Sequence, residues 1–132
     1  MVTPVMTVYV DILPSAGVSG DDYSVNMIRF HARAEGEYFN GETVMDGVDT
    51  QIFMNGKFTM SARYILEGTD FKGEKCKVFI ENSGSTLSDL SPAIITDSKA
   101  LSFLQQGKLS AVGESIGDGV IIRIFLTEDE AK

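Results

Sequence analysis

The sequence predicts an all-β protein with mainly antiparallel strands, folded as a closed or nearly closed barrel of about eight strands. Two observations predict this fold: apolar and polar residues alternate in segment after segment, and glycine-rich turn sequences separate those segments. A third observation, a helical pattern near residues 98–106, adds one short helix. The 132 residues are expected to form a single domain, residues 1–132, with one hydrophobic core.

The strand segments are rich in Val, Ile, Phe and Tyr, which suit a pleated, half-buried surface. Turn chemistry sets their limits: PSAGVSGDD follows the first segment, NG follows the third, GTDFKGE follows the fourth and GDG precedes the last. Short strands at such regular spacing are typical of a barrel or a sandwich. The predicted strands are residues 5–13, 27–35, 43–54, 57–67, 76–83, 93–96, 108–114 and 120–126.

The stretch TDSKALSFLQQG departs from the strand pattern. Asp97 or Ser98 can cap a first helical turn, and Gly107 supplies a stop. Three apolar residues between them can share one face: Ala100, Leu101 and Leu104. We expect a short helix here that plugs or covers one end of the barrel.

Composition and charge exclude several classes of protein. Eleven basic and 19 acidic residues give a net charge of -8, and the basic residues do not cluster, so no nucleic-acid partner is expected. No stretch has the pattern of a signal peptide or a membrane span. The single cysteine, Cys76, cannot form an internal disulfide, which indicates a reducing compartment. We therefore expect a soluble cytoplasmic protein without a membrane partner.

The dipeptide Asn55-Gly56 predicts a two-residue type I′ turn, and this turn fixes the register of a hairpin. Met54 then faces Lys57, and the pairing continues until Asp49 faces Ala62. One face of the hairpin carries Asp49, Gln51, Phe53, Phe58, Met60 and Tyr64. The other face carries Val48, Thr50, Ile52, Thr59, Ser61 and Arg63. The first face is expected to be interior, because its phenylalanines and methionine belong in a core.

This register turns Asp49, Gln51 and Tyr64 inward together. Burial of an unpaired carboxylate costs more than the roughly 1.5–3 kcal/mol that a buried Phe returns, so something must compensate. The candidates are hydrogen bonds from Gln51 and Tyr64, a cation, a water-filled pocket, or a raised pKa that leaves Asp49 neutral. Because an eight-stranded barrel can hold one small ligand, the sequence predicts a binding site in the lumen.

Other arrangements of these residues stay open. Asp49 can instead cap a turn or hold a strand end through backbone amides. A β-bulge would turn Asp49 outward and bring Arg63 inward as its ion-pair partner, which makes Arg63 a further candidate binding residue. Asn82 shares a strand face with the apolar residues Val78 and Ile80 and is expected to face the same cavity, or to stabilise the turn before SGS.

Four stretches resemble the β-barrel family catalogued as domain of unknown function 3237: GETVMDGVDTQ, SARYILEGTD, CKVFIENSG and ITDSKALSFL. The resemblance runs from about residue 34 to the end of the chain. The shared Asp-x-Gln strand, Arg-Tyr strand and strand ending in Gly correspond here to Asp49, Gln51, Arg63, Tyr64 and Gly84. The resemblance implies a closed antiparallel barrel that often self-associates and has no established general activity. This chain departs from the family at Thr50, where many members carry Trp, and at Ser61, where many carry an acidic residue.

No metal or cofactor is predicted. His31 is the only histidine, and it shares a strand face with Arg29 and Arg33, so it is expected to face solvent. One histidine and one cysteine are too few for a zinc site, and DGVDTQIFMNGK lacks the pattern of an EF-hand. Cys76 is expected to be a small core residue.

Two functions compete on this evidence. The first is the binding of a small organic molecule in the lumen, in the form of a binding protein or of a cofactor-independent lyase, isomerase or cyclase. Asp49 and Tyr64 would be the catalytic groups, and Gln51 and Asn82 would orient the substrate. The second is a structural or interaction module that forms a homodimer through outer-face residues such as Phe79, Ile121 and Phe125. Both can hold for one protein, and a dimer with a small pocket is the central expectation.

Overall fold

The computed structural model describes residues 1–128, which form ten β-strands and one short α-helix. The strands are β1 (Val2–Ile12), β2 (Ala16–Ser19), β3 (Ser24–Glu35), β4 (Phe39–Thr43), β5 (Gly47–Met54), β6 (Lys57–Asp70), β7 (Lys75–Thr86), β8 (Asp89–Thr96), β9 (Lys108–Ile116) and β10 (Gly119–Thr127). The helix is α1 (Phe103–Gln106).

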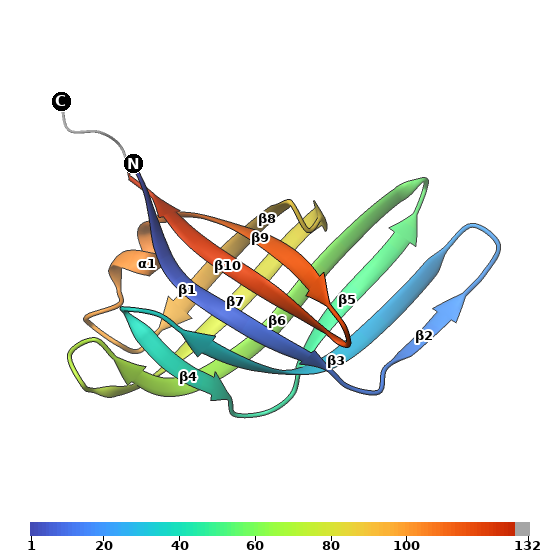
Figure 1. The fold of residues 1–132 in the computed structure, drawn as a ribbon. Coiled ribbons are helices and arrows are strands. Elements are labelled where there is room, and N and C mark those ends of the chain that lie inside the picture. Colours follow the sequence, from blue (N-terminus) through green and yellow to red (C-terminus); the bar gives the residue numbers. More distant parts are fainter. Residues whose placement is uncertain (129–132) are drawn as a thin grey trace.

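Eight strands close into an antiparallel barrel, which confirms the predicted fold class. Their order around the ring is β1-β10-β9-β8-β7-β6-β4-β3, and pairing of β1 with β3 closes it (Figure 1). The two remaining strands, β2 and β5, lie outside the ring. Closure removes the exposed edges that an open sheet of this size would carry.

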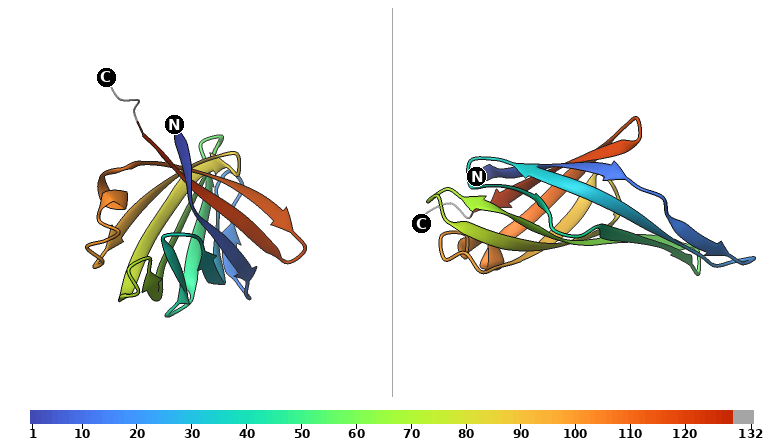
Figure 2. Two further views of the ribbon diagram at one scale, coloured as in Figure 1. Left: turned by 60° about the vertical axis from the view of Figure 1, so that its left-hand side comes forward. Right: turned by 90° about the horizontal axis from the view of Figure 1, so that it is seen from below.

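Two of the ring strands, β3 and β6, continue past the ring. β1 and β2 run one after the other along β3, separated by residues 13–15. In the same way β4 and β5 occupy one position between β3 and β6, separated by residues 44–46. β2 and β5, together with the outer parts of β3 and β6, therefore form a four-stranded extension that projects from one end of the barrel (Figures 1 and 2).

The eight predicted strands correspond to β1, β3 and β5 to β10, whereas β2 and β4 were missed. The predicted strand 43–54 covers β5 and only Thr43 of β4, and residues 44–46 leave the ladder between these two strands. β2 was missed, because its four residues lie in a stretch of turn-forming residues and all four are exposed. Gly17 allows this strand to lie close to β3, since a Cβ there would stand 2.7 Å from the carbonyl oxygen of Val25.

The helix is where the sequence predicts it but is shorter. It begins at Phe103, and turns occupy residues 100–102 before it. Ser98 does cap a turn, because its Oγ accepts a hydrogen bond from the backbone amide of Leu101 at 3.2 Å. Asp97 instead accepts a hydrogen bond from the backbone amide of Lys77 at 2.8 Å. Leu101 and Leu104 are fully buried, so this segment covers one end of the barrel as expected.

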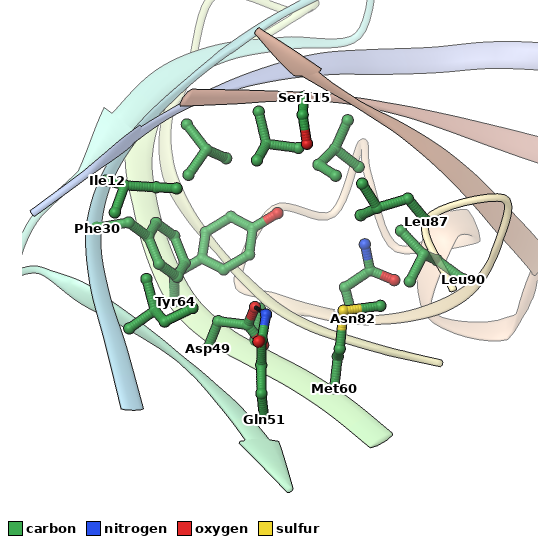
Figure 3. Close-up of a pocket in the computed structure, with 15 residues that line it drawn as sticks. Ile12, Phe30, Asp49, Gln51, Met60, Tyr64, Asn82, Leu87, Leu90 and Ser115 are labelled. Atoms are coloured by element: carbon green, nitrogen blue, oxygen red, sulfur yellow. Dashed lines mark hydrogen bonds between the residues drawn. The ribbon is translucent and has the colours of Figure 1, made fainter. Parts of the chain in front are cut away.

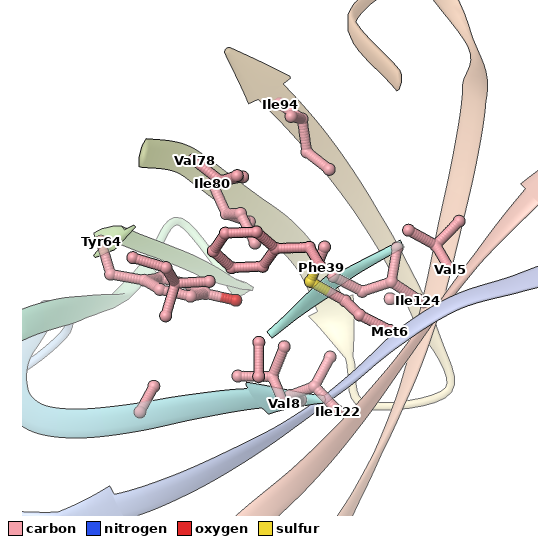
Figure 4. Packing of buried hydrophobic residues seen from close by; sticks show 14 of the residues in the cluster. Val5, Met6, Val8, Phe39, Tyr64, Val78, Ile80, Ile94, Ile122 and Ile124 are labelled. Atoms are coloured by element: carbon pink, nitrogen blue, oxygen red, sulfur yellow. The ribbon is translucent and has the colours of Figure 1, made fainter. Parts of the chain in front are cut away.

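The hydrophobic core fills the lumen at the end covered by α1. Phe39 is fully buried there among side chains from β1, β7 and β10, as Figure 4 shows. The largest fully buried side chains are Phe39, Leu66, Ile80, Leu101, Leu104, Ile124, Val5, Val8 and Val78. The space that side chains leave in the lumen lies toward the opposite end.

Candidate ligand-binding site

A cavity of about 250 Å³ occupies the lumen at the end from which the extension projects (Figure 3). At about 30 Å³ for each water molecule in the liquid, this volume equals roughly eight waters. Most of its lining is hydrocarbon from β1, β3, β6, β8 and β10. Its polar side chains are Asp49, Gln51, Tyr64, Asn82 and Ser115. The predicted polar patch therefore lines a cavity, not a packed core.

The Asn55-Gly56 hairpin has the predicted register without a bulge. Both turn residues have positive φ, 55° for Asn55 and 75° for Gly56, as a type I′ turn requires. Every residue from Val48 to Met54 pairs as expected with β6, and Asp49 stands opposite Ala62. The bulge alternative is therefore wrong, and Asp49 lines the lumen.

Asp49 is a half-buried carboxyl group with incomplete hydrogen bonding. The side-chain nitrogen of Gln51 donates to its Oδ2 at 3.0 Å. Its Oδ1 is buried and has no hydrogen-bond partner among residues 1–128. Burial raises the pKa of Asp49, and hydrogen bonds from Gln51 and from the backbone amide of Ser61 offset part of this effect. The environment therefore favours the protonated form more than water does.

Tyr64 presents a phenolic hydroxyl to the same cavity. Its side chain is 5% exposed, and its ring packs edge-on against Phe30 with 5.3 Å between the ring centroids. Figure 3 shows the hydroxyl pointing toward the middle of the cavity. Burial raises the pKa of Tyr64 well above its usual value of 10.0, so the hydroxyl stays protonated and can donate a hydrogen bond.

Asn82 lies on β7 and lines the cavity, which was the first of the two positions predicted for it. Its side chain is 5% exposed, and its Oδ1 is buried without a hydrogen-bond partner in the part of the chain that the structure describes. The turn placement is not observed, because β7 continues to Thr86 and Asn82 pairs within the ladder with Ala62 and Pro92. A buried amide oxygen without a partner is unusual in a folded protein.

Arg63 was predicted as a candidate binding residue, but it does not line the lumen. It lies on the outer face of β6, and its Nε is 2.7 Å from a carboxylate oxygen of Glu81. The unbroken two-residue alternation of β6 places Arg63 outside for the same reason that it places Ala62 and Tyr64 inside. Its guanidinium therefore does not neutralise Asp49.

Phe53 and Phe58 lie on the expected face but are not buried. They stand opposite each other near the hairpin tip and are 43% and 39% exposed. The pattern gave the correct face, but the strands continue beyond the ring, where no opposite wall covers them. Side chains on this face are interior only as far out as Gln51 and Met60.

Ser115 is a polar lining residue that sequence reasoning missed. It lies on β9 opposite Val120, and its hydroxyl points into the cavity in Figure 3. The predicted strand stopped at residue 114, whereas β9 continues to Ile116. Extension of the alternation through Leu109, Ala111 and Gly113 would have placed Ser115 on the inner face.

His31 and Cys76, the only histidine and the only cysteine in the sequence, do not line the cavity. His31 is half-exposed, with Nδ1 2.9 Å from the hydroxyl of Thr43 and Nε2 3.1 Å from a carboxylate oxygen of Glu42. Cys76 is buried, as predicted. Within residues 1–128 there is no group of three or more His, Cys, Asp or Glu side chains that could hold a metal ion. No helix in that range has the length and apolar character needed to cross a membrane.

Comparison with known proteins shows the fold alone. No protein-family model matches the chain, and no curated protein matches it. The fold is similar to that of a protein of unknown function from Clostridium acetobutylicum, with a TM-score of 0.82 and 18% identity over 97% of this chain and 99% of the other. A β-barrel-like protein from Acinetobacter baumannii gives a TM-score of 0.77 and 19% identity over 96% and 94% of the two chains. An enzyme from Penicillium herquei gives a TM-score of 0.78 and 11% identity over 97% of this chain and 94% of the other.

Proposed function

We propose that this protein binds a small organic molecule in the barrel lumen. The observation that carries the proposal is the cavity of about 250 Å³, whose mostly apolar wall carries a few polar side chains: Asp49, Gln51, Tyr64, Asn82 and Ser115. Pockets of this kind, with apolar walls and a few convergent polar groups, are typical of small-molecule sites in proteins. The single, buried Cys76 fits a function in the cytoplasm.

The same groups suit proton-transfer chemistry without a cofactor. Asp49 lines the cavity and has a raised pKa, so its carboxyl group can accept or donate a proton at a bound molecule. Tyr64 can donate a hydrogen bond to an oxygen that becomes negative during the reaction, and Asn82 can do the same through its amide nitrogen. This set of roles matches a lyase, isomerase or cyclase. The enzyme from Penicillium herquei is a precedent for catalysis on a similar fold.

Binding in the lumen is tested by nuclear magnetic resonance with a library of neutral fragments. We expect some fragments to shift the amide signals of Ala62, Tyr64 and Asn82. Val120→Phe, which adds bulk inside the cavity, should abolish these shifts, whereas Val112→Phe on the outer face should not. Absence of any fragment that perturbs lumen residues, or equal binding to Val120→Phe, would contradict the proposal.

The catalytic part has its own test. Once a molecule that turns over is found, Asp49→Asn should still bind it but should lower kcat by at least a hundredfold, the usual contribution of a general acid or base. Asp49→Asn keeps an oxygen that can accept the hydrogen bond from Gln51, so it changes the proton chemistry more than the shape. Unchanged turnover would exclude Asp49 as the general acid or base.

Self-association is a second candidate function, and the extension supports it better than the predicted outer-face residues. Phe79 and the pair Ile121 and Phe125 lie on strands that are separated by β8 and β9, so they do not form one patch. The extension exposes several large apolar side chains: Val18, Met27, Phe53, Met54 and Phe58. β2 also leaves one edge of the extension unpaired, and two copies could pair there antiparallel about a twofold axis.

Light scattering coupled to size-exclusion chromatography tests this second function. The wild type should be a dimer, and Val18→Lys on the open edge should be a monomer. Val112→Lys, on the outer face of β9, is the matched control and should stay dimeric. A monomeric wild type at micromolar concentration would exclude the interface.

A further inference from the structure

Phe53 and Phe58 form an aromatic pair on the inner face of the extension. They stand directly opposite each other on β5 and β6, where side chains of one face contact each other across the ladder. Both side chains remain exposed, because the extension projects beyond the wall of the ring (Figure 2). A contiguous exposed apolar patch of this kind often marks a binding site.

The aromatic pair continues the wall of the lumen. Three successive opposed pairs share the inner face of the hairpin, from the lumen outward: Asp49 with Ala62, Gln51 with Met60, and Phe53 with Phe58. The first two pairs line the cavity, and the third lies just outside it. A molecule that fills the cavity and projects toward the extension therefore meets Phe53 and Phe58 next.

A second hollow, of about 360 Å³, lies against the aromatic pair on the same face. Strands β2 and β3 form its other side, with Ser24 and Asn26 among the lining residues. Gln51 lines both this hollow and the lumen cavity, so the two spaces adjoin each other. One elongated molecule can therefore occupy both.

The hydroxyl of Tyr64 supplies a polar contact at the inner end of this combined site. It points toward the middle of the cavity in Figure 3, and no hydrogen bond from residues 1–128 affects its pKa. Its oxygen is accessible from the cavity, whereas Oδ1 of Asp49 and Oδ1 of Asn82 are closed off by neighbouring atoms. Because the hydroxyl stays protonated, it is a donor for a neutral acceptor such as a carbonyl oxygen.

We infer that the site takes an elongated, neutral aromatic ketone, whose carbonyl oxygen accepts a hydrogen bond from Tyr64 in the lumen and whose far end lies on Phe53 and Phe58. This inference rests on the proposed function of the lumen and adds a second subsite outside the ring. An aromatic far end gains ring–ring contact with the phenylalanine pair in addition to the area that it buries.

The charges of the two linings favour a neutral molecule. Asp49 is the one acidic or basic side chain that lines the lumen cavity within residues 1–128, and none lines the second hollow. An anion would therefore meet Asp49 without a balancing cation. A cation would lose its hydration in a mostly apolar cavity, where the carboxyl group already accepts a hydrogen bond from Gln51.

Self-association through the open edge of the extension does not require the aromatic pair. Strand alternation places Val18, Met27 and Met54 on the outer face of the extension, opposite to the face of Phe53 and Phe58. A second copy that pairs with β2 would contact the edge and this outer face. The inner face, which is continuous with the lumen, would stay available to a ligand.

Two neutral aromatic ketones of different length test the inference on the wild-type protein. The long probe is prodan, 6-propionyl-2-(dimethylamino)naphthalene, whose emission moves to shorter wavelength in apolar surroundings. The short probe is acetophenone, which should occupy only the lumen and should displace prodan. We expect prodan to bind more tightly than acetophenone, and 2-naphthoate, an anion, not to bind measurably.

Variants separate the two subsites. Phe53→Ser and Phe58→Ser should each weaken prodan binding roughly fivefold and leave the affinity for acetophenone unchanged. Met54→Ser, the neighbouring exposed position on the outer face of β5, is the matched control and should change neither affinity. Tyr64→Phe should weaken both ketones by a similar factor of up to about ten, because both lose one hydrogen bond. Dispersed amide spectra establish that each variant is folded.

The outcomes distinguish this inference from the proposed function. If acetophenone binds in the lumen but prodan does not, or if prodan binds the two phenylalanine variants as it binds the wild type, the second subsite is overturned and lumen binding stands. Preferred binding of 2-naphthoate would overturn the neutral ligand class. A dimer that Phe53→Ser converts to a monomer would assign the aromatic pair to the subunit contact instead. If neither ketone nor any neutral fragment binds, the inference and the proposed function fall together.

Discussion

The hydroxyl of Ser98 donates a hydrogen bond to Oδ2 of Asp70 at 2.7 Å, and both residues are buried. The other oxygen of Asp70 accepts hydrogen bonds from the backbone amides of Lys72 and Glu74, at 2.9 and 3.1 Å. One carboxylate thus organises the β6–β7 turn and ties it to the segment that leads into α1. This connection holds the covered end of the barrel together.

Ser98→Ala should destabilise the protein at neutral pH. The hydrogen bond from Ser98 is the main reason that the pKa of Asp70 lies below its usual value of 3.8, with the amides of Glu74 and Lys72 contributing further. A carboxyl group with a lowered folded-state pKa stabilises the fold above its unfolded pKa, and that stability is lost as the pH falls through the folded value. Thermal denaturation should therefore show a midpoint several degrees lower for Ser98→Ala at pH 7, and a smaller difference below pH 3.8. A constant difference across this range would contradict the assignment.

Asp49→Asn should have the opposite effect on stability. Burial raises the pKa of Asp49 above 3.8, so its ionisation opposes folding once the pH rises through the folded-state value. The variant removes this cost and should raise the denaturation midpoint by a few degrees at pH 7, with no gain below pH 3.8. Asp21→Asn, at an exposed turn, is the control and should change nothing. A lower midpoint for Asp49→Asn at pH 7 would show that the carboxylate is a structural tie.

Gly68→Ala should be strongly destabilising. Gly68 faces Gly41 where β4 and β6 approach closely, and a Cβ on Gly68 would stand 1.9 Å from the carbonyl oxygen of Asn40. Relief of this overlap requires the two strands to separate, which we expect to cost more than about 2 kcal/mol in a urea titration. At Gly20 the nearest atom would be 3.6 Å away, so Gly20→Ala should be tolerated. Equal stabilities of the two variants would be inconsistent with the close approach.

Cys76 should be unreactive in the folded protein. Its thiol is buried, and burial together with the nearby carboxylates of Asp70 and Asp97 raises its pKa, so little thiolate is present at neutral pH. A disulfide reagent such as Ellman's should label it only as fast as the barrel opens, and immediately in denaturant. Complete labelling within seconds under native conditions would show that this part of the barrel opens freely.

The hairpin from Gly47 to Tyr64 shows what local sequence determines. A two-residue turn with positive φ at both positions leaves one register, and that register alone places Asp49 and Tyr64 in the lumen and Arg63 outside. Asn82 follows from the same alternation on β7. The polar patch was therefore predictable, because strand alternation is a local rule.

The remaining features depend on where strands end relative to the ring, which alternation does not encode. Phe53 and Phe58 have the pattern of core residues, but they are exposed because the opposite wall stops short of them. Ser115 lies one residue beyond the predicted end of its strand, and β2 is too short and too exposed to give a pattern. The resemblance to the family of domain of unknown function 3237 stays a prediction.

At the junction between ring and extension, two side-chain hydroxyls take the place of backbone carbonyls beside β3. The Oγ of Ser15 accepts from the amide of Arg29 at 3.1 Å, and the Oγ1 of Thr43 accepts from the amide of Ala32 at 3.2 Å. Insertions or deletions at residues 13–15 and 44–46 can therefore alter the aperture of the barrel while the shear and strand number of its closed part stay fixed. Barrels that differ only in these two connecting segments can therefore have openings of different width and tilt, while the closed part of the barrel stays the same.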